Sequence, residues 1–247
     1  MNPIRRRLLA ALPAAALASA VPPSLCFAQG ADVAAALARW PHDGRVAYRI
    51  LLGERGLLVG RTVHAWQHDG QRYRLTSVSE SEGVAALFAS GQARQESIGS
   101  IGADGLQPES FRHVARRHDD RADFDWSART VRYRERVEPL APGTQDLLSM
   151  YYQLALRRAP GGALTMPIAT GRKQAVYAFV FVGRETLTVG AATHAVEHVR
   201  VTQGEQQFDF WVTPLAAGEG SPLPLRMRVR ERNGQVFDQV LDLAAHG

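Results

Sequence analysis

The chain has 247 residues, of which 29 are lysine or arginine and 24 are aspartate or glutamate. This length fits a single domain of the larger all-β kind, because sandwiches and barrels of about 200 to 250 residues commonly form one unit. The formal net charge of +5 includes three arginines near the N-terminus, and without them 26 basic residues stand against 24 acidic ones, or +2. An excess this small does not indicate nucleic acid as a partner.

Residues 1–28 have the layout of a secretory signal peptide. Three arginines at residues 5–7 precede an apolar run rich in alanine and leucine, and small residues follow it. The run is too short for a permanent membrane anchor, so we expect no transmembrane segment in the mature chain. We predict cleavage after Ala28, with Cys26 and Ala28 at the two small-residue positions, and cleavage after Ala20 is the alternative.

This N-terminus predicts an exported protein of the bacterial periplasm. Leu8 and Leu9 follow the arginines, which also fits a twin-arginine signal, so the export route stays open. Cleavage after Ala28 removes the single cysteine. The mature protein must then be stabilised by a hydrophobic core and not by disulfides.

From Arg45 onward the chain consists of short runs that alternate apolar with polar residues. Asp69-Gly70 and Asn233-Gly234 lie between such runs, and these pairs supply the positive φ angles of a two-residue hairpin turn. We count about a dozen strands and no second helix long enough for parallel crossover units. The pattern predicts an all-β, mainly antiparallel up-and-down meander that forms an open or half-closed β-barrel. We expect residues 29–44 to be a lead-in and residues 45–247 to form one domain.

The period of two predicts one polar and one apolar face for the sheet. In the run TVRYRERV, three arginines alternate with Val131, Tyr133 and Val137, and RMRVRER repeats the pattern. The run AVYAFVFV at residues 175–182 is apolar on both faces. We therefore expect that strand to be covered on both sides.

The segment PGTQDLLSMYYQLALRR predicts one α-helix over residues 144–158. Thr144 suits the N-cap position, and Pro-Gly-Gly at residues 160–162 ends the helix. The concave face of a wide curled sheet is too large for its own side chains to fill. We expect the barrel to wrap around this central helix through one apolar stripe. The stripe contains Leu147, Leu148, Tyr151, Leu154 and Ala155.

The segment HAVEH at residues 194–198 matches the H-x-x-E-H pattern of inverted zinc peptidases. It continues into a strand-like run, however, and four residues of a strand span about 13 Å, too far for two ligands of one zinc. We therefore predict no metal and no cofactor. The sequence contains no G-x-S-x-G elbow, P-loop or dinucleotide glycine motif, so we assign no catalytic residue and do not favour an enzyme.

Several blocks of the chain resemble an exported bacterial family, the domain of unknown function 3108. They are LLVGRTVHAWQHDGQRYRLTSVSESEGVAALF, LQPESFRHVARR, FDWSARTVRYRE, PGTQDLLSMYYQLA, FWVTPL and PLRMRVRE. The FDW block and the G-x-QD-x-x-S-x-x-YQL block are the specific parts. The resemblance covers most of the chain after the signal and implies a periplasmic all-β protein. It brings no established activity and no catalytic residues.

We expect a non-enzymatic protein that binds an apolar or lipid-like small molecule in the concave face of the sheet. The candidate lining residues are the aromatic side chains Trp66, Tyr151, Tyr152, Tyr177, Phe179, Phe181, Phe208 and Phe210. One alternative is a cell-envelope interaction module that binds a protein partner through its arginine-rich face or a sheet edge. A second alternative is a hydrolase, which would need a convergent cluster such as His113, His118 and Asp123.

Overall fold

The computed structural model describes residues 33–82, 92–116, 118–157, 163–203, 205–213 and 221–242. The predicted signal peptide at residues 1–28 and the predicted helix end at Arg158 lie outside them. Within the described residues, no helix is long and apolar enough to cross a membrane.

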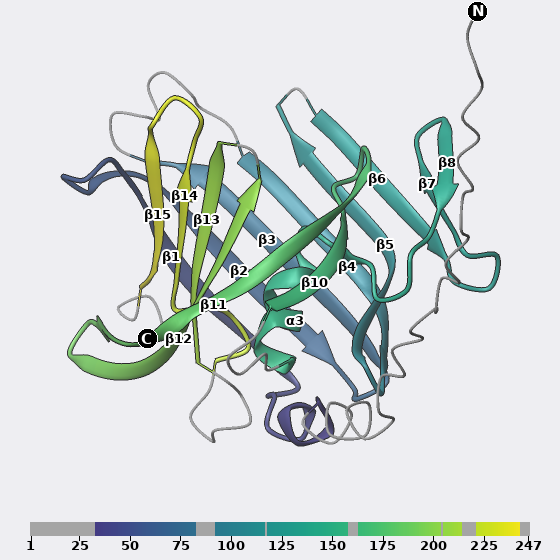
Figure 1. Cartoon of the computed structure of the whole chain (residues 1–247), viewed down its shortest axis with the longest axis horizontal. Coiled ribbons are helices and arrows are strands. Elements are labelled where there is room, and N and C mark those ends of the chain that lie inside the picture. The colour runs from purple at the N-terminus through teal and green to yellow at the C-terminus, as the bar shows by residue number, and fades with distance from the viewer. Residues whose placement is uncertain are drawn as a thin grey trace, which may run out of the picture.

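Within these described residues, fifteen strands pair into one sheet, shown in Figure 1. The first strands are β1 (Asp43–Leu52), β2 (Leu57–His68), β3 (Arg72–Ser81), β4 (Gln92–Gly102), β5 (Gly105–Ala115), β6 (His118–Asp125), β7 (Thr130–Tyr133) and β8 (Arg136–Pro139). Next come β9 (Gln145–Asp146) and helix α3 (Ser149–Leu156). The last strands are β10 (Ala163–Ala169), β11 (Gln174–Val189), β12 (Ala192–Gln203), β13 (Gln206–Val212), β14 (Arg226–Arg230) and β15 (Val236–Leu241). A short helical segment at residues 33–37 precedes β1.

The strand order shows two up-and-down meanders joined in the middle of the sheet. From one end to the other the order is β8-β7-β6-β5-β4-β3-β2-β1-β15-β14-β13-β12-β11-β10-β9. All neighbours are antiparallel except β9 and β10. Strands β8 and β9 are the two ends, so the sheet is open. The prediction of an all-β, mainly antiparallel meander is therefore confirmed, and Figure 1 shows β11–β13 curling back in front of β2–β4.

Local turn chemistry fixes the two hairpins that the sequence predicts. Gly70 has a φ of 87°, and the Asp69 carboxylate accepts the backbone N–H groups of Gln71 and Arg72 at 2.8 and 2.7 Å. Gly234 has a φ of 80° in the second turn. β2 pairs with β3 across the first turn and β14 pairs with β15 across the second, as predicted.

The helix is shorter than predicted and begins later. α3 covers Ser149–Leu156, because the preceding residues Gln145 and Asp146 form β9 and pair with Ile168 and Ala169 of β10. Backbone that pairs with a neighbouring strand cannot also be helical. The helix start is held by Asp146, whose Oδ1 accepts the N–H groups of Leu148 and Ser149, both at 2.8 Å.

Thr144, the predicted N-cap, has a different role. Its hydroxyl donates to the carbonyl of Ala141 at 2.7 Å. The single apolar stripe is also too narrow a description, because Met150, Gln153 and Leu156 are buried as well as Leu148, Leu154 and Ala155. A helix that is buried nearly all round is packed on several sides.

Two predictions about strand faces are wrong. The run TVRYRERV is a hairpin, with a turn between β7 and β8. Val131 and Tyr133 are buried, but Val137 lies on β8 opposite Arg132 and is 48% exposed. Alternation along one strand cannot be continued through a turn.

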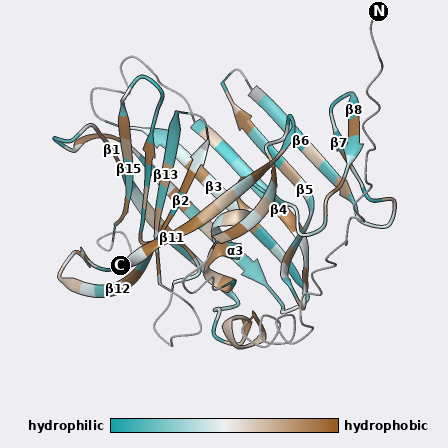
Figure 2. Ribbon diagram, in the orientation of Figure 1, coloured by the Kyte–Doolittle hydropathy of each residue, from teal (hydrophilic) through white to brown (hydrophobic). Residues whose placement is uncertain are grey.

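Strand β11 is not covered on both sides. Figure 2 shows it as a largely hydrophobic strand, yet Val176 is 67%, Val180 49% and Val182 48% exposed. The alternate residue Phe179 is buried in the core. β11 lies near the end of the sheet, next to β10 and β12, and in the described part of the chain no element is packed over these valines.

Candidate functional site

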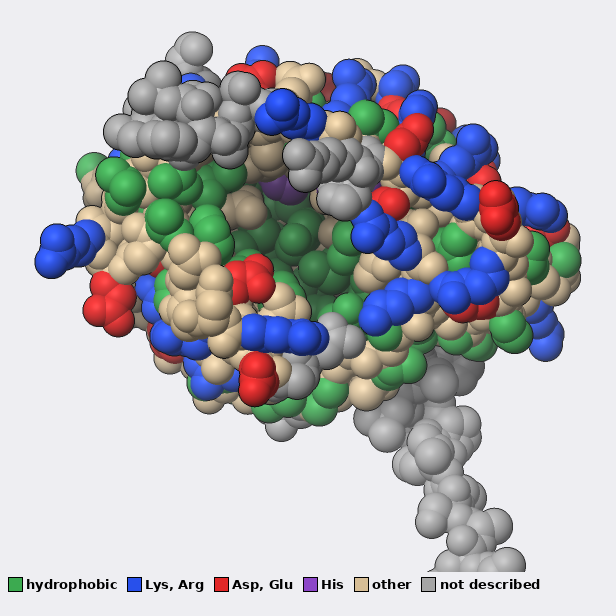
Figure 3. Space-filling model, turned by 90° about the horizontal axis from the view of Figure 1, so that it is seen from above, with side chains coloured by type: hydrophobic (Ala, Val, Ile, Leu, Met, Phe, Trp, Pro, Cys, Tyr) green, Lys and Arg blue, Asp and Glu red, His purple; other side chains and the backbone are tan. Residues whose placement is uncertain are grey.

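One end of the molecule is hollowed. Figure 3, the view from above, shows a depression with hydrophobic side chains deep inside it and charged side chains around its rim. It lies on the concave side of the curled sheet, the face that carries the buried core. The strand register shows which residues share this concave face.

One wall of the hollow is aromatic and belongs to the second meander. The register aligns Phe179 with Val201 and Phe208, and it aligns Val199 with Phe210, on one face of β11, β12 and β13. The Phe210 ring is 6.2 Å from the Phe179 ring, measured between centroids. Such aromatic pairs pack favourably at this separation.

Six of the eight predicted lining residues belong to this wall or reach it. Phe179 and Phe210 are buried, and Tyr151, Tyr177 and Phe208 are half-buried against the core. Phe181 is half-buried opposite Val199. The other two, Trp66 and Tyr152, are almost fully buried with ring centroids 6.2 Å apart, and they fill the core between β2 and α3.

The facing wall belongs to the first meander and is polar. Five side chains form one cross-strand row on the concave face of β2–β6: His64, Ser77, Gln95, His113 and Asp120. In the next row, Thr62 and Ser79 are joined by a 2.8 Å hydrogen bond. The concave face is therefore not uniformly apolar, contrary to the sequence prediction. We call the row of five the polar row.

His64 is the most unusual member of the polar row. Its side chain is 3% exposed, and its Nδ1 atom is buried without a hydrogen-bond partner. The rings of Tyr48 and Tyr151 lie edge-on to it at 5.4 and 6.1 Å. Burial lowers the pKa of His64 to about 4, so the imidazole is neutral at neutral pH. A neutral imidazole offers one donor and one acceptor. A buried polar group without a partner costs about 1 to 3 kcal/mol and is uncommon.

Tyr151 connects the two walls. It projects from α3, and its ring lies 6.1 Å from His64 on one side and 6.0 Å from Phe210 on the other. The helix therefore brings one amphipathic side chain to the place where the polar row and the aromatic wall meet.

The two ends of the curled sheet do not pair as strands, and side-chain contacts connect this part of the sheet instead. Ser97 of β4 donates to Asp146 at 2.5 Å, and Gln145 donates to the carbonyl of Leu106 on β5 at 2.7 Å. Burial raises the pKa of Asp146 to about 6, although its hydrogen bonds act in the opposite direction. Arg172, in the turn between β10 and β11, donates to Asp120 of the polar row at 2.9 Å. These contacts join the β9–β11 end of the sheet to β4–β6.

The HAVEH segment lies in β12, as the strand interpretation requires. Its second histidine, His198, lies between two carboxylates, with Nδ1 2.7 Å from Glu185 and Nε2 2.7 Å from Asp209. The Trp211 ring stacks on it at 4.6 Å. Asp209 is partly buried, which raises its pKa, but hydrogen bonds from neighbours including Arg200 outweigh this and hold the pKa low. Among the described residues, no group of three or more histidine, cysteine or acidic side chains is arranged to hold a metal ion.

The predicted hydrolase cluster is not brought together. His113 lies on the concave face in the polar row, whereas Asp123 is out of phase with it and forms an ion pair at 2.9 Å with Arg121. Successive positions alternate between the two faces of a sheet. The backbone of His118 pairs with Ala115 at the start of β6, and its side chain is outside the described part.

The region that builds both walls matches one family model. The model, described as a protein of unknown function, DUF3108, matches residues 45–241. The chain belongs to the DUF3108 family. The DUF3108 match extends from the third residue of β1 to the last residue of β15, so it contains both walls, α3 and all the contacts that hold the sheet. No curated protein matches this DUF3108 chain.

A solved structure shares the architecture of this DUF3108 protein. It is the crystal structure of a beta-barrel-like protein of domain of unknown function DUF1849 from Brucella abortus. The two chains superpose with a TM-score of 0.53 at 13% sequence identity, over 82% of this chain and 97% of the Brucella chain. At this identity the likeness concerns the fold alone.

Proposed function

We propose that this DUF3108 protein is a non-enzymatic binding protein that holds an amphipathic, lipid-like molecule in the hollow. The observation that carries the proposal is that Tyr151 contacts two unlike surfaces, with its ring 6.1 Å from His64 of the polar row and 6.0 Å from Phe210 of the aromatic wall. Pockets for small molecules are mostly apolar, with a few placed polar groups that orient the ligand. The hollow has both kinds of surface.

The buried Nδ1 atom of His64, which has no hydrogen-bond partner, indicates which part of the ligand the polar wall would hold. His64 would exchange a hydrogen bond with a hydroxyl, amide or ester group, while the apolar part would lie against Phe179 and Phe210. A polar group that is left without a partner in the free protein gains most when a ligand supplies one. In this proposal α3 is the central filler of the barrel, and Tyr151 contacts both parts of the ligand.

The proposed place of action is the periplasm. Support comes from residues 1–28, which have the arginines, apolar run and small residues of a cleaved export signal. A carrier for a poorly soluble molecule is useful in an aqueous compartment between membranes.

Extraction of the protein purified from the periplasm, followed by lipid mass spectrometry, tests the proposal directly. We expect one class of amphipathic molecule at near-stoichiometric amount. Delipidated protein should then bind the fluorescent fatty acid parinaric acid with saturation. His64→Leu should lower the affinity for probes that carry a hydrogen-bonding head group by about tenfold. The proposal fails if extracts contain no enriched molecule and no amphipathic probe saturates.

A second candidate function is binding of an envelope protein, and the exposed valines of β11 favour it. Val176, Val180 and Val182 form an apolar strip on the convex face near the open end of the sheet. An apolar contact should survive high salt, because screening weakens only charge interactions. A pull-down from envelope extract at high salt should therefore retain a partner that the double variant Val176→Ser, Val180→Ser loses. Equal retention by the variant would exclude this surface.

A further inference from the structure

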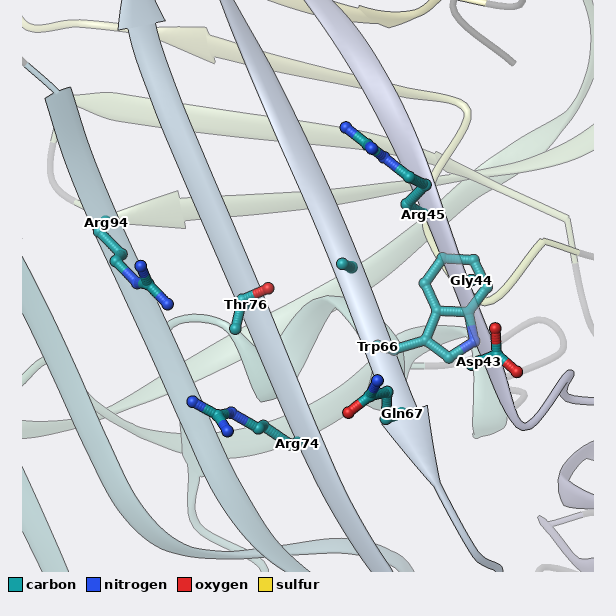
Figure 4. Close-up of a pocket in the computed structure, with 9 residues that line it drawn as sticks. Asp43, Gly44, Arg45, Trp66, Gln67, Arg74, Thr76 and Arg94 are labelled. Carbon is teal, nitrogen blue, oxygen red and sulfur yellow. The ribbon is translucent and has the colours of Figure 1, made fainter. Parts of the chain in front are cut away.

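A groove crosses the convex face of β1–β4, on the opposite side of the sheet from the hollow. Its volume is about 360 Å³, and Figure 4 shows the long side chains that lie around it. The groove exists because small residues occupy its floor. Ala65 and Thr76 pair directly across β2 and β3, while the neighbouring Trp66 points to the core face.

Three arginines surround this floor from three strands. Arg45 on β1 pairs with Ala65, Arg74 lies two residues from Thr76 on β3, and Arg94 lies on β4. Figure 4 shows the guanidinium groups of Arg74 and Arg94 pointing toward one another beside Thr76. Neighbouring strands are about 4.8 Å apart, so these side chains start within two to three strand spacings of one another.

Two of these arginines, Arg45 and Arg94, have no acidic partner among the described residues. Nearby convex-face arginines are paired, for example Arg72 with Glu109 and Arg112 with Asp119. Arg45 and Arg94 form no such ion pair. Unpaired guanidinium groups remain able to bind an incoming anion.

The third arginine and the local acids do not cancel this charge. Arg74 donates its Nε hydrogen to Glu96 at 2.6 Å, and Asp43 lies at the rim of the groove. The three guanidinium groups outnumber these two carboxylates. The Gln67 amide and the Thr76 hydroxyl also line the groove and add neutral donors.

We propose that this groove binds a phosphate group. Guanidinium groups form paired hydrogen bonds to phosphate oxygens, and Arg74 and Arg94 face each other from two neighbouring strands, with Arg45 at the other side of the groove. The phosphate could belong to a free compound or to the head group of a membrane lipid, since both present the same oxygens. This inference does not depend on the hollow or on its ligand.

Isothermal titration of the full exported protein with inorganic phosphate, in a phosphate-free buffer, is the first test. We expect saturable binding that weakens with added sodium chloride, because the contacts are ionic. Arg94→Gln should weaken it by about tenfold or more, the scale of a lost charge-assisted hydrogen bond. The affinity of Arg94→Lys for phosphate should lie between those of the wild-type protein and Arg94→Gln, since lysine keeps the positive charge but loses the paired N–H donors of the guanidinium group. The control is Arg132→Gln, which removes an exposed arginine from β7, outside the groove, and should change the affinity less than twofold.

Co-sedimentation with vesicles distinguishes the two sources of phosphate. Binding to phosphatidylglycerol vesicles but not to phosphatidylcholine vesicles, with loss in Arg94→Gln, would indicate a lipid head group. Binding of inorganic phosphate with the same loss, and no vesicle binding, would indicate a free compound. The proposal is overturned if neither probe depends on Arg94, or if Arg132→Gln reduces binding as much as Arg94→Gln does. Circular dichroism of each variant checks that the exposed substitutions leave the fold intact.

Discussion

Replacement of His64 by leucine tests whether this buried imidazole is neutral and lacks a partner in the folded protein, through the dependence of stability on pH. Leucine has a similar size but no ring nitrogen, so the substitution removes a buried polar group that lacks a partner at Nδ1. Removing such a group is expected to leave stability unchanged or to raise it at neutral pH, because the variant no longer pays the free-energy cost of taking the ring nitrogen out of water on folding. At pH 7.5, His64→Leu should therefore be at least as stable as the wild-type protein.

The pH dependence gives the magnitude. The pKa of His64 falls from 6.5 to about 4 on folding, so the unfolded chain binds a proton between these values and the folded protein does not. Above pH 6.5 the imidazole is neutral in both states, so it adds no pH dependence to the free energy of unfolding. As pH falls from 6.5 toward 4, the unfolded chain is protonated and the free energy of unfolding decreases. A shift of this size corresponds to about 3 kcal/mol, at about 1.4 kcal/mol for each pH unit. Leucine has no such dependence.

Urea unfolding of both proteins at pH 7.5, 6, 5 and 4 measures this difference. The free energy of unfolding of His64→Leu should exceed that of the wild-type protein by an amount that grows by about 3 kcal/mol over this range. Other titrating groups are common to both proteins and cancel in the comparison. A difference that stays constant with pH would refute the reasoning, because it would mean that His64 can take up a proton in the folded protein.

Three further substitutions test the core and the helix start. Asp146→Asn should show the opposite pH effect. The folded-state pKa of Asp146 is raised from 3.8 to about 6, so its ionisation destabilises the folded protein as pH rises. In urea unfolding, the free energy of unfolding of the variant should therefore rise by about 3 kcal/mol relative to wild type between pH 4 and 7. Leu148→Ala, at a fully buried site, should lower the free energy of unfolding by about 2 to 5 kcal/mol. Gly44→Ala should destabilise by about 1 to 3 kcal/mol in thermal unfolding and change the tryptophan fluorescence, because a Cβ there would lie 2.3 Å from the Trp66 ring.

Matched controls separate these effects from a general response to substitution. Val137→Ala removes a side chain that is about half exposed and should change stability by less than about 0.5 kcal/mol. Gly102→Ala adds a Cβ with no heavy atom within 4 Å and should be tolerated. If either control costs as much as its partner, packing at Leu148 or Gly44 is not the cause.

Predictions that rested on local chemistry were the most accurate. Asp69-Gly70 and Asn233-Gly234 determine their own hairpins through φ angles and side-chain hydrogen bonds, so neighbouring residues were sufficient. The helix start could not be found in this way. Gln145 and Asp146 are prevented from being helical by Ile168 and Ala169, more than twenty residues later in the chain.

The polar row was missed although the sequence contains a signal for it. In LVGRTVHAWQH, Thr62 and His64 fall on the same face as Trp66, and in QRYRLTSVS, Ser77 falls on the same face as Leu75. One face therefore changes from apolar to polar along each strand. Only the cross-strand register, which depends on pairing between strands, shows that these positions form one continuous row.

The outer side of β11 shows a different limit. Alternation tells which residues share a face, but not whether another element covers that face. Val176 and Phe179 are both apolar, but they lie on opposite faces: Phe179 is buried in the core, while Val176 is exposed because no described element covers the convex face there.

The pairing of β1 with β15 has a consequence for the order of folding. Each of the strands β2–β8 pairs with a strand that is adjacent in the sequence. One edge of β1, in contrast, pairs with Phe237–Leu241 of β15, near the other end of the described chain. Contacts between such distant residues slow folding, because a long loop has to close first. A nascent chain can therefore form its N-terminal hairpins early, but the seam that unites the two halves closes only after almost the whole polypeptide has been delivered.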